Sequence, residues 1–303
     1  MVTDGRSAER RDGGGSRLQG FHQLMPYRVR KVLLVASRYD SFIIEEEGQL
    51  TDLILKEYDR LNLRYAPQIS STPSSREALR LIESDMRFDL VILTLHPGSM
   101  DPCDFAREVR RRSPDTPVIL LGYDNRELAD LLERGDGDVF DQVLVWAGDA
   151  RILLATVKLI EDAWNADHDT AAVGVEVIIV VEDSVHFISS FLPLLYARLM
   201  EQSQRLIAEG VNVSHKILRM RARPKVLLAS NFEKAWELYE RYRGSVLGVI
   251  SDVRYSRAGR DDPEAGLELV RRIRDDNPDV PVILQSTELD NEPKARQAGA
   301  AFL

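Results

Sequence analysis

Cysteine, clustered histidine and long apolar runs are all scarce in this 303-residue chain. Cys103 is the only cysteine, so neither an intrachain disulfide nor a thiolate metal cluster can form. The five histidines are scattered, and no two have the spacing of metal ligands on a helix. The apolar runs are strand-length, far short of the roughly 20 residues of a membrane span. These absences argue against disulfide scaffolds, histidine-ligated metal sites and membrane proteins.

The first 26 residues also lack an apolar signal core. They are rich in Gly, Arg and Ser, and we predict that 1–26 is a disordered tail. Its glycines are neither preceded by a strand nor followed by Gly-Lys-Ser/Thr, which argues against a phosphate-binding loop. The formal net charge of −9 argues against general nucleic-acid binding. We therefore expect a cytoplasmic protein that binds neither nucleic acid nor membrane.

Two short β-branched runs, Val175–Val181 and Val246–Asp252, are typical of strands buried on both faces of a parallel sheet. Glu182 and Asp183 follow the first run, and Asp252 ends the second. Functional sites in open α/β sheets form at the carboxyl ends of strands, so these carboxylates converge if the strands are neighbours. Three carboxylates at such short distances repel one another, and they ionise most readily when a hard cation lies between them. The pattern predicts a Mg²⁺-sized oxygen site beside a carboxylate that could act as a nucleophile.

An internal repeat divides the chain into two α/β units with doubly wound parallel sheets. The strands predicted for the first unit are Arg30–Ser37, Tyr65–Ile69, Phe88–Leu95, Pro117–Gly122 and Val139–Trp146. Those predicted for the second are Val175–Val181, Lys225–Ser230, Val246–Asp252, Pro281–Gln285 and the start of a fifth in Gly299–Leu303. A sheet without its closing helix leaves one face uncovered, so we expect the native chain to continue past Leu303.

The predicted organisation is a first domain over 27–164, a polar linker over 165–174 and a second domain over 175–303. A long helical stretch over 187–221, interrupted near Pro193 and Gly210, replaces a normal first helix in the second domain. Core packing with a solvated basic end explains this stretch. The alternative is a surface for dimerisation or for contact with an output domain.

The second domain resembles a response-regulator receiver domain in four features that come in the same order along the chain. They are Glu182-Asp183 after the first strand, Asp252 after the third, Ser286 at the end of the fourth, and Gly299-Ala300 before the fifth. The resemblance implies a flavodoxin-like fold with strand order 2-1-3-4-5. It implies that Asp252 accepts a phosphoryl group from a histidine kinase or phosphotransfer protein and that the Ser286 hydroxyl senses this group. It also implies that Glu182, Asp183, Asp252 and the backbone carbonyl of Arg254 hold Mg²⁺.

Two features depart from the family pattern. The family's lysine after the fifth strand would fall just beyond Leu303. The loop after Asp252, over 254–264, is longer than usual, and the family's glycine in this loop corresponds to Gly266, displaced by several residues.

The first domain resembles a degenerate receiver, or pseudoreceiver. Ala36-Ser37-Arg38 stands where the acid pair would be, and Asp40 lies too far along to replace it. Thr94 replaces the acceptor, Gly122 the hydroxyl residue and Trp146 the lysine. A threonine cannot form an acyl phosphate, so we expect a fold kept for interaction. Phosphorylation of Thr94 by a dedicated kinase is the alternative.

Three functions remain open. The first is a non-enzymatic phosphorelay module that regulates an output outside this chain. The two domains together also resemble the amino-terminal half of bacterial proteins that continue into a pyruvate phosphate dikinase-like, phosphoenolpyruvate/pyruvate-binding domain. The second is an enzyme that uses Asp252 as a covalent nucleophile, although a haloacid dehalogenase-like enzyme would have aspartate where Arg254 stands. The third is a phosphorylation-independent structural or interaction module.

Overall fold

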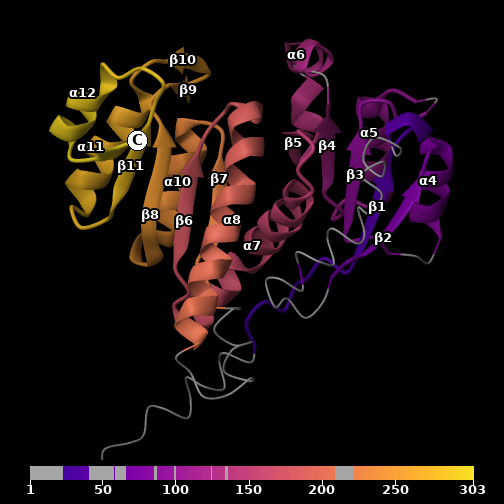
Figure 1. Cartoon of the computed structure of the whole chain (residues 1–303), viewed down its shortest axis with the longest axis horizontal. Coiled ribbons are helices and arrows are strands. Elements are labelled where there is room, and N and C mark those ends of the chain that lie inside the picture. Colours follow the sequence, from indigo (N-terminus) through magenta and orange to yellow (C-terminus); the bar gives the residue numbers. More distant parts are fainter. Residues whose placement is uncertain are drawn as a thin grey trace, which may run out of the picture.

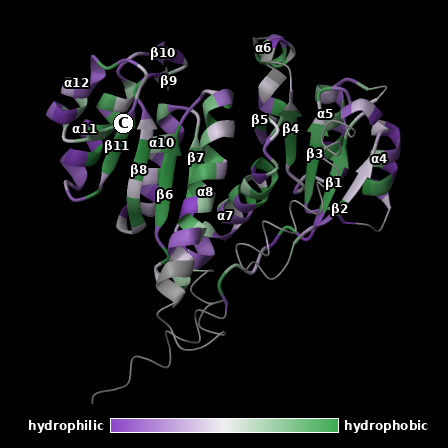
Figure 2. Ribbon diagram, viewed as in Figure 1, coloured by the Kyte–Doolittle hydropathy of each residue, from purple (hydrophilic) through white to green (hydrophobic). Residues whose placement is uncertain are grey.

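The computed structural model describes residues 23–40, 58, 66–84, 87–98, 100–123, 125–133, 136–208 and 222–303. These residues form two five-stranded parallel sheets that stand on either side of helices α7 (Arg151–Val173) and α8 (Val185–Ala208) (Figure 1). Figure 2 shows that the strands of both sheets are mostly apolar and that the outer helices have many polar residues. Within the described residues, no helix is long and apolar enough to cross a membrane.

The first sheet has the strand order β2-β1-β3-β4-β5. Its strands are β1 (Lys31–Val35), β2 (Gln68–Thr72), β3 (Leu90–Thr94), β4 (Val118–Gly122) and β5 (Gln142–Val145). Its other helices are α4 (Ser75–Glu83), α5 (Pro102–Arg112), α6 (Asn125–Glu133) and the 3-10 helix η1 (Asp136–Val139). Every residue of β3 and β4 is buried, as expected for central strands covered on both faces.

The second sheet has the order β12-β11-β8-β6-β7. Its strands are β6 (Val177–Val181), β7 (Lys225–Ala229), β8 (Val246–Asp252), β11 (Val282–Gln285) and β12 (Ala301–Phe302). Its other helices are α10 (Phe232–Tyr242), the 3-10 helix η2 (Arg243–Ser245), α11 (Ala265–Asp276) and α12 (Asn291–Ala298). When strands are numbered within each domain, both sheets have the order 2-1-3-4-5. The predicted flavodoxin-like fold is confirmed for both.

The long loop after Asp252 is folded into a β-hairpin, which the sequence analysis did not predict. Strands β9 (Tyr255–Arg257) and β10 (Arg260–Asp262) pair antiparallel across a two-residue turn. Both turn residues have positive φ, 52° at Ala258 and 71° at Gly259, as a twisted two-residue hairpin turn requires. Tyr255 is buried in the core of the second domain and anchors the hairpin there.

The predicted linker over 165–174 is mostly helical, which corrects the sequence-based prediction. Helix α7 continues to Val173 and ends at Gly174, whose φ of 71° suits the left-handed position after a helix. Polar residues in this segment favour a linker when only the sequence is considered. Asn165 and Asp169 are instead buried and hydrogen-bonded.

The chain before β1 is fastened to a polar stripe on α7. Carboxylate and amide oxygens of Asp169, Asn165 and Glu161 accept from the backbone N–H groups of Met25, Tyr27 and Val29 at 3.0, 3.0 and 3.2 Å. The accepting side chains are four residues apart on the helix, a rise of about 6.0 Å, and the donating N–H groups are two residues apart on an extended chain, a rise of about 6.6 Å. The two spacings therefore match. The predicted tail is therefore wrong for 23–26, where Leu24 and Met25 are buried; residues 1–22 lie outside the described residues.

The same helix is bonded to the second domain through buried charges. Asp162 pairs with Arg223 at 2.7 Å and accepts from the N–H of Val226 in β7 at 3.0 Å. Asp169 pairs with Lys225 at 2.8 Å. One apolar cluster also includes residues of both sheets together with α7 and α8. Helix α7 is therefore part of both domains.

Helix α8 is continuous through Pro193, so the predicted interruption there is wrong. Proline frees the carbonyl four residues earlier, at Ser189. The Ser189 hydroxyl donates to the Val185 carbonyl at 2.6 Å and accepts from the N–H of Val145 at 2.8 Å. This last bond covers the edge of the first sheet at β5 with a residue of the second domain. The rest of the predicted stretch, 209–221, lies outside the described residues.

Candidate metal centre

The three carboxylates predicted to converge do so at the carboxyl ends of β6 and β8. These strands are direct neighbours, with Val181 paired to Ser251. One oxygen from each of Glu182, Asp183 and Asp252 lies within 4.8 Å of the other two. In the described part of the chain, no other group of three potential ligands is this close.

The donor set suits a hard divalent cation. Mg²⁺ binds oxygen at about 2.0–2.1 Å, so two of its ligands stand at most about 4.2 Å apart. The three oxygens of this cluster lie within 4.8 Å of one another, which is close to this separation. Asp183 is exposed, which gives an ion a path from solvent.

The electrostatics of the cluster favour a bound positive charge. Burial, followed by the neighbouring charges of Asp252 and Asp183, raises the pKa of Glu182 to about 7. Burial also raises the pKa of Asp183, with Asp261 adding to the effect. Burial raises the pKa of Asp252, and Asp183 adds to it. A divalent cation between the carboxylates would relieve this repulsion.

Short-range hydrogen bonds fix two of the carboxylates. Glu182 accepts from the N–H of Ser184 and from the side-chain amide of Gln285, both at 2.9 Å. The Oδ1 of Asp252 accepts from the N–H of Val253 at 2.7 Å. The buried Gln285 Oε1 has no hydrogen-bond partner among the described residues. The site is therefore held in place before any ion binds.

Gly266 is packed directly against the end of β8, at Asp252 and Val253. A Cβ added at Gly266 would stand 2.9 Å from the Val253 Cα, 3.1 Å from a Leu284 methyl carbon and closer still to the Asp252 carbonyl oxygen. A side chain here would push α11 away from β8. The displaced glycine predicted for the loop therefore has a steric role at the site.

The Ser286 hydroxyl is engaged in the turn before α12. Ser286 follows Gln285, which is paired with Asp252 across β11 and β8. Its Oγ accepts from the N–H of Glu288 and from the side-chain amide of Asn291, both at 3.1 Å. Sensing of a phosphoryl group by Ser286 stays a prediction, as does metal binding by the Arg254 carbonyl.

The Arg254 side chain was not singled out by sequence, and it faces the hairpin. Its Nε donates to both carboxylate oxygens of Asp261 at 3.0 Å, and its Nη2 bonds the same group. Burial chiefly raises the pKa of Asp183, and the charges of Asp261 and Arg254 act on this pKa in opposite directions.

The corresponding place in the first domain has a hydroxyl instead of an acceptor carboxylate. Thr94 ends β3, and its buried Oγ1 donates to Asp40 at 2.8 Å. The Tyr123 hydroxyl donates to the Asp40 carbonyl at 3.4 Å. The sequence spacing predicts that Asp40 lies too far along to replace the acid pair, but its carboxylate lies next to Thr94 because the chain turns into a helix directly after Ser37. The signal that could have found it is the one-turn spacing from the strand end.

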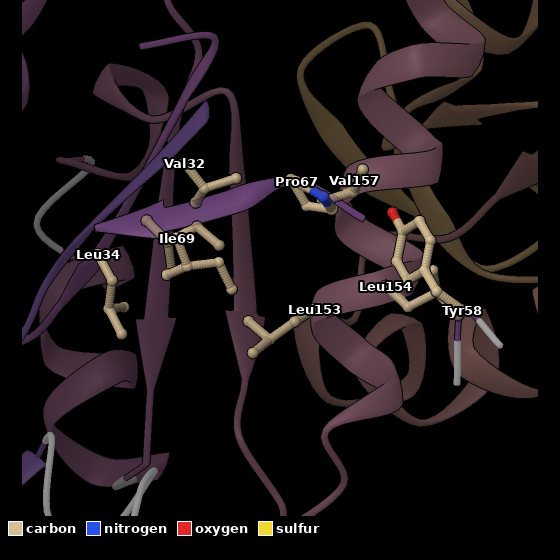
Figure 3. Close-up of a pocket in the computed structure, with 9 residues that line it drawn as sticks. Val32, Leu34, Tyr58, Pro67, Ile69, Leu153, Leu154 and Val157 are labelled. Carbon is tan, nitrogen blue, oxygen red and sulfur yellow. The ribbon is translucent and has the colours of Figure 1, made fainter. Parts of the chain in front are cut away.

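A small cavity in the first domain lies between the sheet and α7 (Figure 3). It is lined by aliphatic side chains such as Val32, Leu153 and Val157, with the buried Tyr58 ring at its edge. The Tyr58 hydroxyl has no hydrogen-bond partner within the described residues. This apolar gap does not adjoin Thr94 and supplies no group for catalysis or metal binding.

No protein-family model matches this chain, and no curated protein matches it. Among solved structures, the response regulator TrrA from Thermotoga maritima, in complex with Mg²⁺ and BeF, is 23% identical. That match covers 43% of this chain and 98% of TrrA, with a TM-score of 0.33. A response regulator from Burkholderia pseudomallei, with a phosphorylated aspartic acid, a calcium ion and citrate, is 17% identical over 63% of this chain and 95% of its own, with a TM-score of 0.31. A two-component system response regulator/GGDEF domain protein is 16% identical over 90% of this chain and 91% of its own, with a TM-score of 0.36.

Proposed function

We propose that this chain is a two-component signalling module in which Asp252 accepts a phosphoryl group beside a bound Mg²⁺. The first domain is a pseudoreceiver that accepts none. The observation that carries the proposal is the approach of three carboxylates to within 4.8 Å at the carboxyl ends of two neighbouring strands. Two of them come from one strand end and the third is the proposed nucleophile.

In the proposed reaction, a carboxylate oxygen of Asp252 attacks the phosphorus of the donor. The bond from phosphorus to the leaving group breaks, and the leaving group departs with the electron pair and takes a proton from solvent. Glu182, Asp183, Asp252 and the Arg254 carbonyl would hold Mg²⁺, which would neutralise charge during transfer. The Val253 N–H, bonded to Asp252 at 2.7 Å, fixes the direction of the acceptor.

The first domain lacks the groups that this reaction needs. Thr94 cannot form an acyl phosphate, and its hydroxyl is buried against Asp40. In the described part of the first domain, no group of three possible metal ligands comes together. We therefore propose that it acts through contacts, with one surface already used by α8 of the second domain.

The proposed partners are a histidine kinase or phosphotransfer protein as donor and an output outside the two domains. Part of the stretch proposed for dimerisation or output contact is used inside the molecule, since Ile188 and Leu192 are buried between the domains. Phe187 and Leu194 on α8 remain exposed and are the part available to a partner. The resemblance to proteins with a phosphoenolpyruvate-binding domain stays a prediction.

The test is intact-mass analysis after incubation with Mg²⁺ and acetyl phosphate. We expect wild-type protein to gain one phosphoryl group and an Asp252→Asn variant to gain none. A Thr94→Ala variant is the matched control and should gain one group like the wild type. Chelation of Mg²⁺ should abolish the gain.

A mass gain that survives Asp252→Asn would contradict the assignment of the acceptor. The absence of any gain, together with no Mg²⁺ binding by calorimetry, would leave a phosphorylation-independent interaction module. Repeated turnover of an aryl phosphate would instead indicate an enzyme.

A further inference from the structure

The side-chain amide of Gln285 reaches the metal centre from the end of β11. Its Nε2 donates to a carboxylate oxygen of Glu182, which follows β6, at 2.9 Å. In the sheet, β8 lies between β11 and β6, so these two strands are about 9.6 Å apart. A short bond between their side chains therefore lies over the end of β8. Asp252 is the last residue of β8 and is paired with Gln285.

One atom of this amide is left without a hydrogen bond. Gln285 is buried, with 5% of its surface exposed, and its Oε1 has no partner within the described residues. Buried polar atoms in folded proteins nearly always have a partner. An amide oxygen can only accept, and the carboxylates of Glu182, Asp183 and Asp252 have no proton to donate when they are ionised. We therefore expect the missing donor to come with a ligand of the site.

A hydrated divalent cation supplies such a donor. Mg²⁺ keeps several of its waters when carboxylates bind it, and these waters can donate hydrogen bonds. A carboxylate that binds a metal is in turn held in orientation by residues that do not touch the ion. The two oxygens of Glu182 accept such bonds, one from the N–H of Ser184 and the other from Gln285, each at 2.9 Å. The nitrogen of the Gln285 amide therefore suits a metal ligand, and its oxygen suits a water on the same ion.

We infer that Gln285 is a positioning residue of the metal centre, whose Nε2 orients Glu182 toward the ion and whose Oε1 accepts from a water bound to the ion. The inference rests on the proposed function and deepens it, because it assigns a residue that adapts the site to Mg²⁺. Mg²⁺ requires nearly ideal octahedral geometry and gives up its waters reluctantly, whereas Ca²⁺ accepts a more flexible arrangement of oxygens. The Gln285 amide should therefore favour Mg²⁺ over Ca²⁺.

The test is calorimetric titration of the whole chain with MgCl₂ and, separately, with CaCl₂. Gln285→Met fills a similar volume without either polar atom of the amide. It should weaken Mg²⁺ binding about 10–100-fold, as the loss of such a partner does at other metal sites, and weaken Ca²⁺ binding less. Gln142→Met is the matched control, because Gln142 lies in β5 of the first domain and its amide donates to the Val143 carbonyl at 3.2 Å. This control should bind both ions like the wild type.

Gln285→Asn is a second variant, which keeps the amide and shortens the side chain by one methylene group. Its amide should no longer reach Glu182, so its Mg²⁺ affinity should fall as in Gln285→Met. Urea unfolding without metal shows which variants are folded, and affinities are compared among those.

Unchanged Mg²⁺ affinity in folded Gln285→Met would overturn the inference. An equal loss of affinity for both ions would also overturn it, because that result indicates a general disturbance of the site. Unfolding of both Gln285 variants would indicate a purely structural residue, and the inference would fail.

The proposed function is tested separately, by phosphoryl uptake at Asp252. If uptake fails while Mg²⁺ binding depends on Gln285 as described, the proposed function is wrong and this inference stands. If the wild type binds neither ion, the metal centre itself is wrong, and both fail.

Discussion

The two domains share one topology but hold different groups at the carboxyl end of the third strand. In the first domain, Thr94 donates to Asp40, so a single buried carboxylate has a neutral partner. In the second, one oxygen of Asp252 lies within 4.8 Å of oxygens of Glu182 and Asp183. Burial raises all three pKa values, and neighbouring carboxylates add to the effect. The comparison shows that the shared fold provides the same position at the end of the third strand in both domains, and that the residues there differ. The two domains differ in the number of carboxylates gathered at this position, and three carboxylates favour a bound cation more than one does.

The largest expected effect comes from giving the first domain an acceptor carboxylate without its metal partners. In Thr94→Asp, the new carboxylate replaces a donor 2.8 Å from Asp40. Two charges about 4 Å apart in an effective dielectric of about 20 repel by about 4 kcal/mol. We expect a loss of unfolding free energy of this order at pH 8, measured with urea, and a smaller loss at pH 5, where one carboxylate is protonated.

Thr94→Ser is the matched control for this variant. It keeps the hydroxyl that donates to Asp40 and should lose about 1 kcal/mol or less. Wild-type stability of Thr94→Asp at pH 8 would show that the first site can accommodate two carboxylates, and the contrast between the domains would fail.

An intermediate effect is expected at Gly266, where the backbone of α11 closely approaches the end of β8. Gly266→Ala places a methyl group within 2.9 Å of the Val253 Cα. Overpacking of this kind costs about 1–3 kcal/mol and should displace Asp252. We expect lower stability in urea and weaker Mg²⁺ binding by calorimetry. Gly244→Ala is the control, because a Cβ there meets nothing within 4 Å. Unchanged Mg²⁺ affinity in Gly266→Ala would contradict the steric role.

The smallest effect is on the pH dependence of stability without Mg²⁺. Burial and like charges raise the pKa of Glu182 from 4.5 to about 7, so the folded state holds a proton that the unfolded state has lost. The unfolding free energy should therefore fall as pH rises from about 4.5 to 7, and the loss should persist above. Glu182→Gln should remove part of this fall, roughly 1–2 kcal/mol at pH 8.

Mg²⁺ sharpens the same measurement. It should stabilise the wild type more at pH 8 than at pH 5.5, since the ion competes with protons for the carboxylates. The gain should shrink in Glu182→Gln. A flat pH profile for the wild type, with no response to Mg²⁺, would mean that the three carboxylates do not act as one site.

Sequence reasoning predicted most of the fold and the acidic site, because both depend on local patterns. Buried β-branched runs marked the central strands, and acids at their ends marked the site. It missed what depends on tertiary contacts. The segment with Asn165 and Asp169 looks solvated until its backbone partners are known. The hairpin is built from charged residues, and only the burial of Tyr255 and the positive φ of Ala258 define it. Arg254 and Asp261 meet because that hairpin folds back.

The shared helix α7 has a consequence for how the pair can be inherited. Its carboxylates hold the backbone of Met25 and Val29 on one side and the cations Arg223 and Lys225 on the other. Any recombination breakpoint inside the helix would leave buried charges without their partners. Neither domain can therefore be exchanged for a foreign one unless α7 and both of its partners are transferred with it. We expect the two domains to be inherited together.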